Sequence, residues 1–127
     1  MTARVLAERH LPAADDLFLA GMRRWVASSM HGCTRGAIQE ACIVLAELLG
    51  NAYRHADAPY GVRLELPAEG KVVVLRVDDS TAAPAEPWPV GKGLLIVRGL
   101  CPQWGVETRP PGKAVWAHLP VLVTPVP

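Results

Sequence analysis

The sequence has 127 residues, half of them hydrophobic, and a formal net charge of +1. This length fits one domain with a real core, and the interspersed charges give no support for binding nucleic acid or an anionic membrane. No apolar run approaches the roughly 20 residues of a membrane span, and the residues after Met1 lack the apolar centre of a signal peptide, so we expect a cytoplasmic protein. Three widely spaced cysteines without a Cys-x-x-Cys pair favour buried thiols over disulfides or zinc.

The first part of the chain predicts a strand followed by a helix. Residues 4–11 have the pattern of a strand, and Asp15 or Asp16 is placed to cap a helix that runs to about Met30. The apolar residues of this helix recur at the offsets expected for packing on a sheet: Phe18, Met22, Trp25, Val26 and Met30. Two glycines separate it from a second helix: Gly32 and Gly36.

The second, longer helix presents two different faces. One is an apolar stripe made of Ile38, Ala41, Cys42, Leu45, Leu48, Leu49 and Ala52. On another face, Glu47, Asn51 and His55 recur every four residues. This polar row is either a solvated surface or, because Ile43 and Val44 flank it, a partly covered one that needs a metal ion or ligand as its partner.

A β-hairpin follows, with strands at 62–66 and 72–77. The second strand delivers Asp78 to its end, where a side chain can reach a pocket. Residues 81–92 contain three prolines and several alanines, so we expect a loop and interpret it as a lid.

Gly91, Lys92, Gly93 and Leu94 open a short helix that ends at Leu100. The unpaired amides of a first helical turn suit phosphate, although a Gly-x-Gly at such a place is often only a turn. Two more strands are expected at 104–108 and 114–119, and the tail 120–127 should be extended. The whole order predicts an α+β sandwich of two layers, with a mixed or antiparallel sheet of about five strands and helices on one face.

Three segments together resemble a known family: 47–56 (ELLGNAYRHA), 91–97 (GKGLLIV) and 112–117 (GKAVWA). With Asp78 between the first two, they look like the histidine-kinase-type ATPase fold shared by gyrase and sensor kinases. They are most similar to the small anti-sigma-factor kinases of actinomycetes. The likeness covers nearly the whole chain as one domain, 1–127.

The resemblance implies ATP and Mg²⁺ as cofactors. By this likeness Asn51 holds the Mg²⁺ that bridges the phosphates, and Glu47 is the general base for a Ser or Thr hydroxyl. Asp78 accepts a hydrogen bond from the adenine amino group. The backbone of Gly91, Lys92, Gly93 and Leu94 wraps the phosphates. The implied partners are a sigma factor and a STAS-type anti-anti-sigma protein that carries the acceptor serine. A homodimer is left open.

The sequence also departs from the family pattern. Ser80 and Ala82 stand where two glycines are common, neither Lys113 nor Ala114 is the usual threonine, and the lid has no arginine. These departures keep a second hypothesis open: a non-catalytic module of the same fold that sequesters a protein partner, with ATP as a ligand or not at all. A third is a helix-and-sheet domain of unrelated function.

Overall fold

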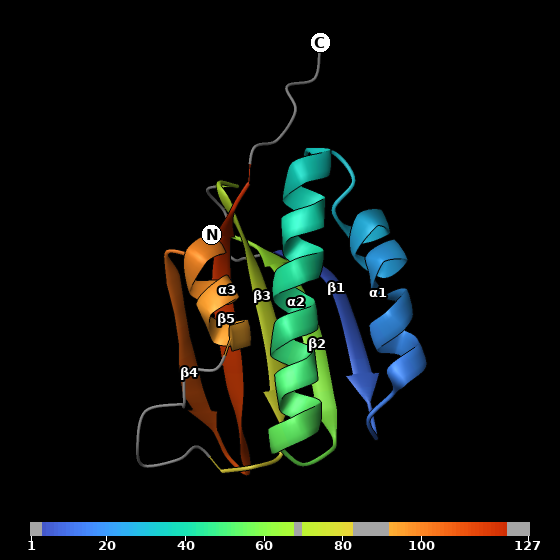
Figure 1. Cartoon of the computed structure of the whole chain (residues 1–127), viewed down its shortest axis with the longest axis vertical. Helices are drawn as coiled ribbons and strands as arrows, with labels where there is room; N and C mark the ends of the chain where they lie inside the picture. The colour runs from blue at the N-terminus through green and yellow to red at the C-terminus, as the bar shows by residue number, and fades with distance from the viewer. Residues whose placement is uncertain (1–3, 68–69, 83–91, 122–127) are drawn as a thin grey trace.

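The computed structural model describes residues 4–67, 70–82 and 92–121, apart from the side chains of 92–94. Its elements follow the predicted order: β1 (Arg4–Leu11), α1 (Asp16–Ser29), α2 (Arg35–His55), β2 (Tyr60–Leu66), β3 (Val72–Asp79), α3 (Lys92–Leu100), β4 (Gln103–Arg109) and β5 (Gly112–Pro120). The strands form one antiparallel sheet in the order β1-β2-β3-β5-β4. All three helices lie on the same face of this sheet (Figure 1). The predicted α+β class and two-layer sandwich are confirmed.

Local signals explain where the helices begin. The Asp15 side chain accepts a hydrogen bond from the backbone N–H of Phe18 at 2.9 Å, and the Thr34 side chain accepts one from Ala37, so both helices have capped N-termini. Gly32 has a φ of +93°, which a side chain rarely adopts and which turns the chain between the helices. The sequence placed Gly36 in this connection, but it lies in the first turn of α2 because the Thr34 cap starts the helix earlier.

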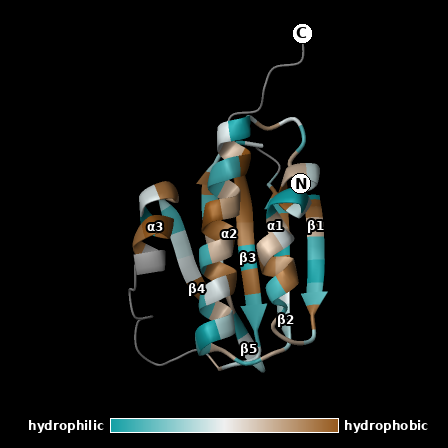
Figure 2. Ribbon diagram, turned by 45° about the vertical axis from the view of Figure 1, so that its right-hand side comes forward, coloured by the Kyte–Doolittle hydropathy of each residue, from teal (hydrophilic) through white to brown (hydrophobic). Residues whose placement is uncertain are grey.

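The core lies between α2 and the sheet. The buried residues of α2 are Ala37, Ala41, Val44, Leu45, Leu48, Leu49, Gly50 and Ala52. They meet alternate residues of the strands, among them Val62, Leu64, Val73, Leu75, Ala117 and Leu119. In Figure 2 the hydrophobic colour follows the middle of the sheet and the inner sides of the helices. The predicted stripe is largely confirmed, although Ile38 and Cys42 are half-buried.

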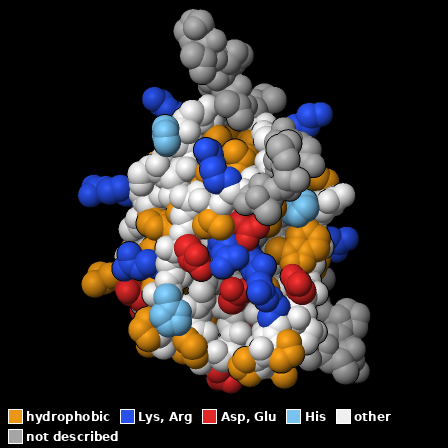
Figure 3. Space-filling model, turned by 180° about the vertical axis from the view of Figure 1, so that it is seen from behind, with side chains coloured by type: hydrophobic (Ala, Val, Ile, Leu, Met, Phe, Trp, Pro, Cys, Tyr) orange, Lys and Arg blue, Asp and Glu red, His pale blue; other side chains and the backbone are white. Residues whose placement is uncertain are grey.

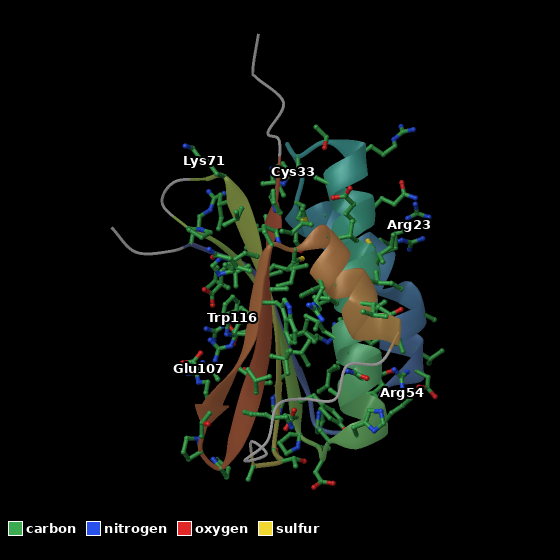
Figure 4. The ribbon with its side chains drawn as sticks, turned by 60° about the vertical axis from the view of Figure 1, so that its left-hand side comes forward. Arg23, Cys33, Arg54, Lys71, Glu107 and Trp116 are labelled. Carbon is green, nitrogen blue, oxygen red and sulfur yellow. The ribbon has the colours of Figure 1, made fainter. Side chains whose placement is uncertain are left out.

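The other face of the sheet carries no helix among the described residues. Arg63 forms ion pairs with Glu8 and Glu65, and Arg76 forms one with Asp78 at 3.0 Å. Figure 3 shows basic and acidic side chains gathered at the centre of this face. Figure 4 shows Glu107 and Trp116 on one side of the molecule and Arg54 on the other. Along β5, Val115, Ala117 and Leu119 face the helices while Trp116 and His118 face away, as the alternation predicts.

Candidate functional site

The ridge of α2 that carries Glu47 and Asn51 is directed toward α3. Glu40, Val44, Glu47 and Asn51 follow one another at spacings of four, three and four residues, which places them on one ridge of the helix. Val44 on this ridge is fully buried. Glu40 acts electrostatically on Cys101, which immediately follows α3. The ridge that carries Glu47 and Asn51 is therefore directed toward α3 and is partly covered.

Glu47 and Asn51 differ in their partners. Glu47 is half-buried, and within the described part of the chain its carboxylate forms no hydrogen bond or ion pair. The side-chain oxygen of Asn51 accepts a hydrogen bond from Arg54 at 3.3 Å. The Arg54 guanidinium lies along the helix over Gly50, where an added Cβ would come within 3.3 Å of it. Arg54 and His55 are exposed at the end of the helix.

The structure places the two aspartates at the end of β3 on opposite faces of the sheet. Asp78, which the sequence singled out, lies on the helix-free face, where its side chain is 40% exposed and pairs with Arg76. Asp79 follows Val77 in the alternation and points to the helix side, where its side chain is 1% exposed. Only Asp79 of the two is therefore on the same side of the sheet as Glu47 and Asn51.

Asp79 is paired with Lys113, the residue opposite it on β5. The ammonium lies 2.9 Å from each carboxylate oxygen and donates a hydrogen bond to Oδ1, while its approach to Oδ2 is an ionic contact without hydrogen-bond geometry. Oδ1 also accepts a hydrogen bond from the backbone of Thr81 at 2.8 Å. The Lys113 side chain is 2% exposed, so both charges are removed from water. Sequence reasoning missed this pair because the two residues are 34 positions apart.

The segment after β3 is held to the end of α2 without glycine. The Asp57 carbonyl accepts a hydrogen bond from the Ser80 backbone, and the Asp57 N–H donates one to the Thr81 hydroxyl. The Ser80 hydroxyl donates to the Pro59 carbonyl. No non-glycine residue in the described ranges has a positive φ, so Ser80, Thr81 and Ala82 need no glycine conformation here. The required glycine is instead Gly112, where a Cβ would overlap the Asp79 carbonyl.

The predicted phosphate-binding turn is described in part. Lys92, Gly93 and Leu94 form the first turn of α3, as expected. Gly91 and most of the predicted lid, residues 83–91, lie outside the described residues, as do residues 122–127 of the predicted tail. In the described parts of the chain, no helix is long and apolar enough to cross a membrane.

Comparison with known proteins identifies the fold. No protein-family model matches the sequence, and no curated protein matches it either. Solved structures do match. One is the crystal structure of the RsbU and RsbW domains of Rv1364c from Mycobacterium tuberculosis, with a TM-score of 0.67 and 16% sequence identity over 91% of this chain and 32% of that one. The chain thus spans about a third of that neighbour's length. At this identity the likeness shows a shared fold alone, an α+β sandwich with helices on one face of an antiparallel sheet.

The orientation of the α2 ridge that carries Glu40, Glu47 and Asn51 can be tested through the Cys101 thiol. Burial, and secondarily the Glu40 carboxylate, raise the pKa of Cys101 to about 11. Glu40→Gln removes the second cause, so the pKa should fall and more thiolate should be present at pH 9. We expect faster alkylation of Cys101 in this variant, measured by mass spectrometry of native protein. Glu47→Gln is the matched control and should leave the rate unchanged. An equal rate in Glu40→Gln and the parent protein would contradict the assigned ridge.

Proposed function

We propose that this protein binds ATP with Mg²⁺ and acts as an anti-sigma-factor serine/threonine kinase. The observation that carries the proposal is the common side of Glu47, Asn51 and Asp79: all three lie on the helix-covered side of the sheet. The last turn of α2 and the end of β3 also lie at the same end of the molecule (Figure 1). The match to a structure containing an RsbW domain supports the fold that this function requires.

Each residue has a chemical role in the proposal. The amide oxygen of Asn51 is a hard ligand that would hold Mg²⁺ while leaving room for water and phosphate oxygens. The carboxylate of Glu47 has no partner among the described residues, so it is free to accept the proton of an acceptor hydroxyl. The first turn of α3, with Gly91 before it, would receive the phosphates.

The base-recognition role passes from Asp78 to Asp79 in this proposal. A carboxylate that binds adenine must face the helices, and Asp79 does so while Asp78 pairs with Arg76 on the opposite face. Arg54 lies beside Asn51 and would supply the positive charge that the arginine-free lid lacks. The proposed protein partners are a STAS-type anti-anti-sigma protein, which would carry the acceptor serine, and a sigma factor.

A second candidate is a non-catalytic module of this fold that sequesters a protein partner. Two contacts favour it: Asp79 is already paired with Lys113, and Asn51 already accepts a hydrogen bond from Arg54. Both groups thus already have a protein partner without a nucleotide. Partner binding that does not change in Asn51→Ala or on removal of ATP would support this candidate over the kinase.

Nucleotide binding should stabilise the protein only when the metal site is intact. Mg²⁺-ATP at 100 times its dissociation constant should add about 2.7 kcal/mol to the free energy of unfolding, which should raise the melting temperature by roughly 10 °C. Asn51→Ala or removal of Mg²⁺ with EDTA should abolish the shift, since the bridging ion is lost. Gln39→Ala on an exposed position of the same helix is the control and should keep it. A shift that survives Asn51→Ala would contradict the assigned metal ligand.

Phosphoryl transfer should depend on Glu47 and not on Glu40, a second glutamate of the same helix. Glu47→Gln removes the proposed base and should slow transfer from labelled ATP to a STAS-type protein by about 10²-fold or more. Glu40→Gln makes the same chemical change two turns earlier on the same ridge and should transfer at the parent rate. The assay measures labelled acceptor over time with either variant. Equal rates for both variants would remove Glu47 from the mechanism, and no transfer by the parent protein to any acceptor would count against a kinase.

A further inference from the structure

The Asp79–Lys113 pair occupies the position at which the proposed function needs a base-binding carboxylate. The two residues face each other on β3 and β5, and Lys113 is the largest of the fully buried side chains. Lysine is rarely buried in this way unless it has a specific partner. The partner here is the one acidic group at the end of β3 that points toward the helices.

The hydrogen bonds of Asp79 are divided unevenly between its two oxygens. Oδ1 accepts from the Lys113 ammonium and from the Thr81 backbone. Within the described ranges Oδ2 is buried and accepts no hydrogen bond, although the ammonium lies 2.9 Å away. The carboxylate therefore keeps unused acceptor capacity on one oxygen, which is the capacity that an amino group of a base could use.

Access to that oxygen is blocked by the same lysine. The Asp79 and Lys113 side chains are only 1% and 2% exposed, so a ligand cannot reach Oδ2 while the ammonium stays in place. The Thr81 backbone and Gly112 also fix the position of Asp79: one donates to it, and the other passes so close to its carbonyl that no side chain fits. A ligand that uses this carboxylate must therefore displace the Lys113 side chain.

We propose that Lys113 masks the base-recognition carboxylate Asp79 and so sets the affinity of the site for the base portion of a nucleotide. This inference rests on the proposed nucleotide site and adds a determinant of its specificity. In the parent protein the phosphates then provide most of the binding, because the base must displace a buried ion pair to reach its acceptor. Replacing Lys113 by threonine opens the space beside Asp79, and the threonine hydroxyl can still donate a hydrogen bond to the Asp79 carboxylate.

The experiment measures dissociation constants by calorimetry for three probes with Mg²⁺: ATP, adenosine and inorganic triphosphate. The parent protein should bind ATP and triphosphate within about threefold of each other and adenosine weakly. Lys113→Thr should bind ATP and adenosine about tenfold more tightly and triphosphate as before. The double variant Asp79→Asn with Lys113→Thr should lose that gain, because the gain requires the carboxylate.

Separate results overturn the inference and the proposed function. Unchanged or weaker adenosine binding in Lys113→Thr overturns the masking role, while ATP binding by both proteins would leave the nucleotide site standing. A parent protein that binds ATP more than tenfold better than triphosphate also overturns it, and this comparison needs no variant that must fold. Binding of none of the three probes to either protein rejects the nucleotide site and the masking role together.

Discussion

Burial of one side of α2 on the sheet is the constraint on which the rest of this structure depends. Val44, Leu45, Leu48, Leu49 and Ala52 are each at most 4% exposed. Burying each of the larger side chains is worth about 1.5–3 kcal/mol, so the rotation of this helix is strongly fixed. With that face buried in the core, the helical period places Glu47 and Asn51 on the ridge of α2 that is directed toward α3. The candidate chemistry is thus positioned by apolar packing rather than by polar contacts.

The end of β3 is fixed in position by hydrogen bonds and an ion pair rather than by apolar packing. Hydrogen bonds of Asp57 with Ser80 and Thr81 join the connection after α2 to the end of β3, and the Asp79–Lys113 pair joins β3 to β5. A buried ion pair is weak evidence for stability, since removing both charges together is often neutral, whereas removing one leaves an unpaired charge that costs about 3–5 kcal/mol. The pair therefore fits the proposed role at the nucleotide site better than a role in stability alone.

The elements could be predicted from the sequence because each carries a local signal. The Asp15 cap, the alternation in β5 and the prolines around the helices all act within a few residues. The facing of Asp78 and Asp79 was harder, because β3 is apolar on both faces over most of its length and such a run hides the period of two. Arg76 is the one charged residue within this apolar run and shows which alternate residues of β3 face away from the core. By the same alternation Asp78 faces away with Arg76, and Asp79 faces the core. The alternation in β5 places Lys113 on the helix side with Val115, but its ion pair with Asp79 could not be predicted, since the two residues are 34 positions apart.

The most direct test of this account is a nuclear magnetic resonance titration of ¹⁵N-labelled protein with Mg²⁺-ATP. The account places the ligand between the last turn of α2, the start of α3, the end of β3 and the start of β5. The largest shifts should therefore occur at Asn51 and in the first turn of α3, where the phosphates bind, with smaller shifts at Asp79 and Lys113. The helix-free face around Arg63 and Trp116 should not change. Shifts centred on that face, or none at millimolar ATP, would contradict the account.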